Sequence, residues 1–239
     1  LNYDRSGVVN HTDDPLGIID RSWADVRSQG VSGSIGYPIG QRGEIGVRGN
    51  WRQQHFPNQI LPTGEENGST IWGTNAYLSY RLGRLFRLDG GIGKSWVNPD
   101  SPFTPDFSGL SWNIGLAYTG PRLGVSASTG RNVNGSSGGL YNYSVGNFQN
   151  LAVNYRANQR LSFSTGVSFS DLAYHGSRAI PESDLVRHSK SERYFIGTDY
   201  RMNRMLSFSL DYNHQRRKSD PALYNYQVNT ISLTARANF

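Results

Sequence analysis

The sequence of 239 residues contains no cysteine and no long apolar run. Without cysteine, the chain can form neither a disulfide framework nor a thiolate metal site. No stretch approaches the roughly 18 apolar residues of a membrane-spanning helix, so the sequence predicts none. Leu1 is not followed by the basic and apolar regions of a signal peptide, and we therefore interpret the chain as mature or trimmed.

Hydrophobic residues are also scarce, at 36%, although 12% of the residues are aromatic and 28 are glycine. Disordered chains are poor in aromatic residues, so low hydrophobicity does not indicate disorder here. In a membrane β-barrel only every second strand residue must be apolar, which suits this composition. The formal net charge is +6, but the basic residues are dispersed along the chain, so we predict no nucleic-acid partner.

Apolar and polar residues alternate with a period of two from residue 31 to the end of the chain. Such alternation predicts β-strands with one apolar face. In one typical segment, Ile45, Val47, Gly49 and Trp51 alternate with Gly46, Arg48, Asn50 and Arg52. No segment has a comparable helical period, so the sequence predicts an all-β fold.

The connections between the predicted strands are alternately short and long. Tight turns are expected near Gly40, Gly83, Gly120, Asn158 and Asn203. Ten prolines lie in the long connections or beside tight turns, outside the predicted strands. This asymmetry is typical of transmembrane barrels, which have short periplasmic turns and long extracellular loops. Long connections are predicted at 53–70, 97–106, 132–143, 174–189 and 216–224.

Aromatic residues gather at both ends of the predicted strands. Tyr37, Tyr80 and Tyr118 lie beside short turns, whereas Trp51, Trp72 and Phe148 lie toward the long connections. Phe86 and Trp96 share a face ten residues apart, which in a tilted strand corresponds to about 25 Å, the height of an outer-membrane apolar band. A soluble sandwich has no reason to place its aromatic residues this way.

The last residues alternate in the same manner. The apolar positions are Ile231, Leu233, Ala235, Ala237 and Phe239. This end resembles the C-terminal signal of bacterial outer-membrane proteins, a closing strand that ends in Phe, and the resemblance implies that the barrel-assembly machinery recognises these five residues as an assembly signal.

About eleven strands can be counted between residue 27 and the end of the chain. Bacterial single-chain barrels have an even number of strands, and a closing strand that ends in the periplasm requires one more rising strand. Leu1 to Val9 supplies it. We therefore predict one domain over 1–239, an antiparallel up-and-down barrel of about twelve strands in the bacterial outer membrane, larger if the chain is trimmed. Both termini would be periplasmic.

Catalytic and metal sites find little support in the sequence. His175 and Ser177 have the spacing used by lipid hydrolases of the outer membrane, but they fall in a predicted loop without an orienting partner. Asp171, Asp211 and His214 do not form an evident protease site. The loop with His175, Glu182, Asp184 and His188 lacks metal-ligand spacing. We predict no catalytic residue and no cofactor, and an enzyme acting on lipid or peptide is one alternative.

The alternation places many arginines on the face that would line a barrel lumen. Inward arginines outnumber inward acids, and a ring of arginines selects for anions. The other interpretation is a structural one, in which arginine and aspartate fill a narrow barrel with ion pairs and it does not conduct. The predicted pore-lining residues are Arg48, Arg52, Arg81, Arg87, Asp89, Arg156, Asp199, Arg201, Asp211 and Arg236.

A short motif occurs twice, as "YRANQRLSFS" from Tyr155 and as "YRMNRMLSFS" from Tyr200. Together with the closing strand, this region resembles β-barrel porins encoded beside exopolysaccharide export systems. The resemblance implies a passive channel for polysaccharide or oligosaccharide and no catalytic residues. Expected partners are outer-membrane lipid and lipopolysaccharide, the barrel-assembly machinery and other envelope proteins. A non-conducting scaffold or adhesion barrel is the main alternative function.

Overall fold

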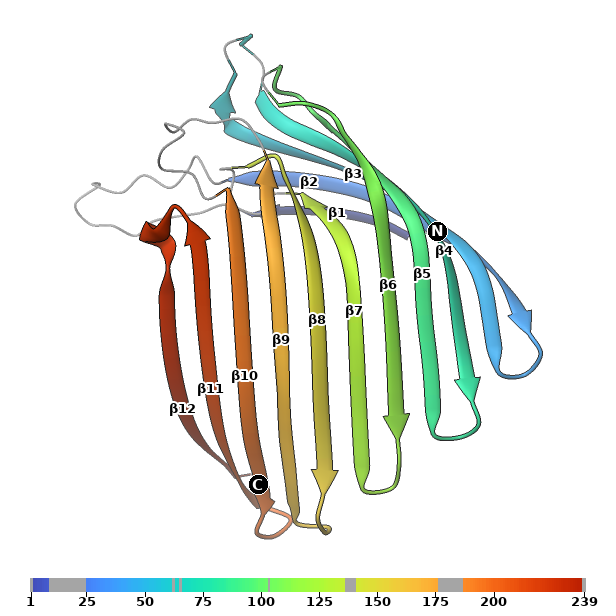
Figure 1. Ribbon diagram of the computed structural model, residues 1–239, viewed down its shortest axis with the longest axis vertical. Helices are drawn as coiled ribbons and strands as arrows, with labels where there is room; N and C mark the ends of the chain where they lie inside the picture. Colours follow the sequence, from blue (N-terminus) through green and yellow to red (C-terminus); the bar gives the residue numbers. More distant parts are fainter. Residues whose placement is uncertain are drawn as a thin grey trace.

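The chain forms one antiparallel sheet of twelve strands, seen in a computed structural model that describes residues 2–8, 25–61, 63–64, 66–102, 104–135, 141–175 and 187–237 (Figure 1). The described residues include no helix that is long and apolar enough to cross a membrane. The strands are β1 (Asn2–Val8), β2 (Val26–Ile39), β3 (Gly43–Ile60), β4 (Glu66–Leu82), β5 (Phe86–Pro99), β6 (Phe107–Thr119), β7 (Leu123–Gly135), β8 (Tyr143–Arg156), β9 (Leu161–His175), β10 (His188–Arg201), β11 (Leu206–Asp220) and β12 (Tyr226–Ala237).

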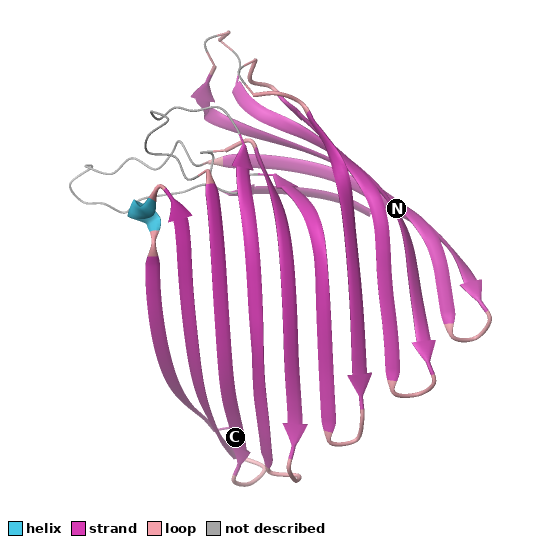
Figure 2. Ribbon diagram, in the orientation of Figure 1, coloured by secondary structure: helices cyan, strands magenta, loops and turns pink. Residues whose placement is uncertain are grey.

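The strands follow each other in sequence order, and each pairs with its neighbours along the chain. The predicted all-β, up-and-down arrangement and the count of twelve strands are confirmed, and β1 coincides with the strand expected at 1–9. Within the described residues no ladder joins β1 to β12, so the sheet is curved but open between these two edges (Figure 2).

The register sorts the side chains onto two faces. The apolar face carries the paired row Trp51, Trp72 and Trp96, and the polar face carries Arg48 opposite Asn75. Apolar side chains are exposed to an unusual degree, with Ile35 at 84% and Ile231 at 74% of their surface. A soluble sheet would bury these side chains, so the apolar face requires a lipid environment.

One aromatic residue departs from the predicted pattern. Phe148 pairs with Gly130 and Ser170, which both lie on the polar face, so its ring is not part of the outward aromatic band. An added Cβ on Gly130 would lie 2.7 Å from the Phe148 ring, so this glycine makes room for the ring.

Several strands extend further than the sequence predicts. β3 continues to Ile60 and β4 begins at Glu66, so the connection predicted at 53–70 shrinks to a few residues. The prediction that prolines lie outside the strands is wrong at Pro38 and Pro99, at the ends of β2 and β5, and at Pro57, inside β3. At Pro57 the pairing with β4 shifts register between Phe56 and Ile60. A proline costs little where a bulge already interrupts the ladder. Backbone pairing therefore continues although the side chains there are polar.

The short turns all lie along one edge of the sheet (Figure 2). Two of them are closed by asparagine. The Asn158 Oδ1 accepts hydrogen bonds from the backbone N–H groups of Arg160 and Leu161, and Asn203 does the same for Met205 and Leu206. An asparagine side chain that satisfies the backbone in this way is a common turn device.

At the opposite edge the sheet folds over itself. The ladder between β6 and β7 ends at Trp112 and Arg131, and beyond it the ends of β7 and β8 pack onto the polar side of β4–β6. The apolar cluster in this overlap consists of Ile71, Val97, Tyr143 and Val145, with Phe107 and Val133 packed against it. Asn142 is fully buried beside the cluster and donates to the carbonyl oxygen of Gly68 at 3.1 Å. The polar face is therefore the concave one.

Candidate functional site

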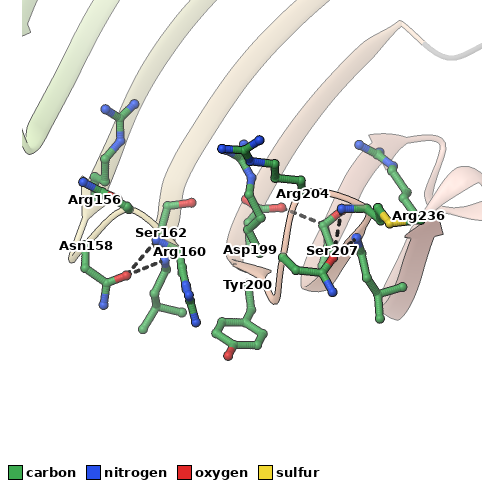
Figure 3. A pocket seen from close by; sticks show the side chains of 16 residues that line it. Arg156, Asn158, Arg160, Ser162, Asp199, Tyr200, Arg204, Ser207 and Arg236 are labelled. Carbon is green, nitrogen blue, oxygen red and sulfur yellow. Dashed lines mark hydrogen bonds between the residues drawn. The ribbon is translucent and has the colours of Figure 1, made fainter. Parts of the chain in front are cut away.

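A large hollow lies on the polar face beside the short turns. It is a groove of about 1190 Å³ formed by the ends of β8–β12 (Figure 3). Five exposed arginines border it, together with a single carboxylate, Asp199. These arginines are Arg156, Arg160, Arg201, Arg204 and Arg236.

The groove is built from the two copies of the repeated sequence motif. In each copy a tyrosine and an arginine end one strand, an asparagine closes the turn, and serines occupy the polar face of the next strand. Register pairs Arg156 with Ser162 and Arg201 with Ser207. Serine side chains are short, so little side-chain volume fills the space between the arginines. The backbone of the strands therefore forms the floor of the groove. Figure 3 shows Arg156 and Arg236 pointing to one side and Tyr200 to the other, as the alternation requires.

The charges in the groove are not balanced. The Asp199 Oδ1 accepts a hydrogen bond from the Ser209 hydroxyl at 2.7 Å. Among the described residues, no carboxylate lies within ion-pair distance of Arg156, Arg201 or Arg236. The groove therefore presents several guanidinium groups, each able to hold a carboxylate or phosphate through two parallel hydrogen bonds.

A second group of predicted residues lies on β4 and β5. The Nε of Arg87 is 2.9 Å from the Oδ2 of Asp89 and 3.0 Å from its Oδ1, which neutralises one charge. Arg81 is directly opposite Arg87 in the register, and both side chains are exposed. Arg81 and Arg87 together carry one more charge than Asp89 neutralises, so this part of the short-turn edge keeps a net positive charge.

The remaining predicted residues lie apart from these groups. Arg48 is on β3 with its guanidinium 5.1 Å from the centre of the Tyr77 ring, whose hydroxyl donates to Glu44. Arg52 is four residues, or two periods of the alternation, further along β3, and Asp211 on β11 lies against Gly197. All ten predicted residues thus occupy the polar face. Whether they line an open pore stays a prediction.

The sequence interpretation missed several arginines. Arg193 donates to Asn213 at 3.1 Å, and Arg217 donates to Ser189 at 2.8 Å, both on the polar face of β10–β11. The same alternation that selected Arg201 would have found them. Arg160 and Arg204 lie in turns, where the alternation does not predict the direction of a side chain. The only sequence feature that could have identified them is that each of the five predicted tight turns contains an arginine.

The catalytic and metal alternatives gain nothing from the geometry. Asp211 and His214 are three residues apart on β11 and therefore lie on opposite faces. Asp171 contacts His188 and Lys190 on the apolar side near the long connections. Ser177, Glu182 and Asp184 lie outside the described residues. Within the described part of the chain, no three potential ligands come together in a way that would hold a metal ion.

The predicted assembly strand corresponds to β12. Ile231 and Leu233 are both 74% exposed on the apolar face, and Ala235 and Ala237 continue the same row. Phe239 lies outside the described residues. The alternation expected for a closing strand is present, while its recognition by the assembly machinery stays a prediction.

Solved structures of outer-membrane proteins are similar to this fold. The FrpB iron transporter of Neisseria meningitidis (F3-3 variant) matches with a TM-score of 0.68 and 13% identity, over 90% of this chain and 40% of FrpB. The outer membrane channel DcaP of Acinetobacter baumannii matches with a TM-score of 0.57 and 12% identity, over 99% of this chain and 70% of DcaP.

The copper transporter OprC matches with a TM-score of 0.57 and 9% identity, over 85% of this chain and 39% of OprC. The chain thus spans about two fifths of the length of FrpB and OprC, and at these identities the likeness shows the fold alone. A search of curated proteins found no match.

Family comparison extends over most of the chain. The family model described as "Putative beta-barrel porin 2" matches residues 45–239, which include β3 from its third residue onward and every later strand. The predicted porin-like character is confirmed at this level, and the chain belongs to the Putative beta-barrel porin 2 family.

Proposed function

We propose that the chain forms the wall of a passive outer-membrane channel that favours anions. The observation that carries this proposal is the groove bordered by five arginines and one carboxylate on the concave face. Fixed guanidinium groups on a surface of low dielectric raise the local concentration of anions and repel cations. Membership of a porin family supports the channel, and the arginines support its selectivity.

The substrate class that suits this face is an anionic oligosaccharide or polysaccharide. Arginine side chains pair with carboxylates, while the serine hydroxyls between them can both donate to and accept from sugar hydroxyls. Ser162, Ser207 and Ser209 line the groove beside the arginines. The similarity to porins encoded beside exopolysaccharide export systems points to the same class.

The proposed orientation places the short turns and both termini in the periplasm and the long connections outside the cell. Lipid and lipopolysaccharide would contact the apolar face, and the barrel-assembly machinery would insert the chain through β12. No chemistry on the substrate is proposed.

Conductance in a planar bilayer tests the channel, and the reversal potential across a salt gradient tests the selectivity. We expect anion preference, reduced in Arg156→Ser/Arg201→Ser/Arg236→Ser and weaker as salt rises, because the screening length is roughly 10 Å at 0.1 M. Arg27→Ser/Arg216→Ser/Lys218→Ser removes equal charge away from the groove and should leave the preference unchanged. Cation preference in the unaltered protein would refute the proposal.

A non-conducting barrel is the second candidate, and one observation favours it. The ends of β7 and β8 pack across the polar face, with Val97 and Tyr143 almost completely buried. If this overlap closes the lumen, folded protein would show no conductance, and replacing Ile71 and Val97 by serine should open it. Conductance in the unaltered protein would instead mean that the overlap leaves a path.

A further inference from the structure

Each of the five turns along the edge that includes Gly40 and Asn203 contains one arginine. The five turns are 40–42, 83–85, 120–122, 157–160 and 202–205, and none of them contains an acidic residue or a second basic one. All five side chains are exposed. We call them the rim arginines, and they are Arg42, Arg84, Arg122, Arg160 and Arg204.

The backbone ties three rim arginines to the edge in the same way. The carbonyl oxygen of Arg42 accepts from the N–H of Arg81 at 2.8 Å. The carbonyl oxygens of Arg122 and Arg160 accept from the N–H groups of Arg156 and Arg201, both at 2.7 Å. Each of these rim arginines therefore lies beside an arginine of the polar face, and the positive charge is continuous from the rim onto the concave surface.

The acidic residues near this edge are already engaged. Glu44 accepts a hydrogen bond from Tyr77, Asp89 holds Arg87, and Asp199 accepts from Ser209. Other acids lie at the opposite ends of the strands, as Asp100, Asp106, Asp171 and Asp220 do. The short-turn edge thus carries an excess of basic residues, whereas the opposite ends of the strands carry acids together with basic residues such as Arg216 and Lys218.

The length of the row of rim arginines indicates which kind of partner could bind it. Strands are about 4.8 Å apart, so successive short turns are about 10 Å apart and the five extend over roughly 40 Å. The turns lie in one row in Figure 2. A small anion needs only one or two arginines, whereas this length matches the footprint of a protein partner. Arginine is also among the residues enriched in protein interfaces.

We infer that the rim arginines form a docking surface for the acidic face of a protein partner on the short-turn side. Lipid phosphates can reach the outer side of the rim, but not Arg81, Arg156 or Arg201 on the concave surface, which continue the same positive strip. The inference goes beyond ion selectivity, although Arg160 and Arg204 also border the groove. The selectivity test changes Arg156, Arg201 and Arg236 and leaves all five rim arginines in place, so the two proposals can fail separately.

The test uses the whole chain in nanodiscs of zwitterionic phosphatidylcholine and a fluorescent thirty-residue polyglutamate peptide as the probe. The rim variant replaces all five rim arginines by glutamine. The control variant replaces five exposed basic residues away from the turns, Arg27, Lys94, Lys190, Arg216 and Lys218, and has the same net charge. Heat-modifiable mobility in gels shows that both variants are folded.

At low salt we expect the rim variant to bind the peptide about 30-fold more weakly, because each exposed ion pair contributes about a factor of two. The control variant should stay within about twofold of the unaltered protein. Equal weakening in both variants would overturn the inference, since binding would then follow net charge alone.

Two further measurements distinguish an acidic protein partner from anionic lipid and from anionic polysaccharide. Adding phosphatidylglycerol to the nanodiscs should leave peptide binding in place. If the lipid instead abolishes it, the rim arginines bind lipid headgroups and the inference is overturned. Replacing the rim arginines should weaken the binding of a polyuronate of equal length less than that of the peptide, because Arg156, Arg201 and Arg236 remain in the groove. A greater loss for the polyuronate than for the peptide would likewise overturn the inference.

Discussion

The backbone N–H of Arg201 donates to the carbonyl oxygen of Arg160 at 2.7 Å, which fixes a turn arginine beside the last arginine of β10. Both side chains border the same groove. Two cations would ordinarily separate in water, so the backbone ladder is what holds this positive charge together. The repulsion between the arginines costs electrostatic free energy, which the folding of the sheet must offset. Anions bound in the groove or at the rim would reduce this repulsion.

The asparagine turns should contribute measurably to stability. In Asn203→Ala the N–H groups of Met205 and Leu206 lose their side-chain acceptor. We expect a loss of about 1 kcal/mol in the free energy of unfolding, measured by urea titration in detergent micelles. Asn203→Asp keeps the accepting oxygen and serves as the control. Equal stability of the alanine variant and the unaltered protein would contradict the role of this bond.

The apolar face of β12 should not tolerate charge. Leu233→Arg places a guanidinium in the lipid at an expected cost of about 2–4 kcal/mol and should reduce insertion into the outer membrane. Thr234→Arg lies on the polar face of the same strand and should insert normally. The amount of heat-modifiable protein in outer-membrane fractions measures both, and the same yield for the two variants would argue against a lipid-facing β12.

The difference between the two edges gives a topology that can be mapped. An epitope inserted between Thr63 and Gly64 should bind antibody on intact cells, because it extends a connection at the long-loop edge. Epitopes at Gly40 or Asn203, in the short turns, should bind only after the outer membrane is permeabilised. Labelling of Asn203 on intact cells would reverse the proposed orientation.

The overlap at the long-connection edge should respond to pH through His175, at the end of β9 beyond Phe169. Its ring stacks on Tyr143 with 4.9 Å between centres, and burial lowers the pKa of His175 below its ordinary value. The packed state therefore binds fewer protons than the open one. The contribution of neutral His175 to the stability of the packed overlap is fully present above about pH 6.5 and declines as the pH falls toward the lowered pKa.

The amide of Asn142 reports this change, because it donates to the carbonyl oxygen of His175 at 2.9 Å. After correction for intrinsic rates, its hydrogen exchange should be less protected at about pH 5.5 than at about pH 7.5. His175→Phe keeps a stacked ring without titration and should show equal protection at both values. A difference that persists in His175→Phe would assign the pH response to another group.

Much of the candidate site could be predicted from the alternation. Arg156, Arg201 and Arg236 were assigned to the inward face because strand residues alternate in direction, and the register agrees with that assignment. The ion pairing could not be predicted. Asp89, Asp199 and Asp211 share the face, but in the described structure only Asp89 lies within ion-pair distance of an arginine, Arg87 on the same strand. Asp199 and Arg201 have the same spacing on β10 and form no such pair there, because the side-chain rotamers decide the contact and the spacing does not fix them.

The sequence by itself determined the strands, the face of each side chain and the position of the short turns. These features depend on neighbours within a few residues, through the period of two and the turn chemistry of glycine and asparagine. Only the tertiary structure decided that β3 continues past Pro57 and that Val97 and Tyr143 pack across the concave side. The first feature depends on pairing with β4 and the second on packing between strands that are not neighbours in the sheet, and a local period carries no information about either.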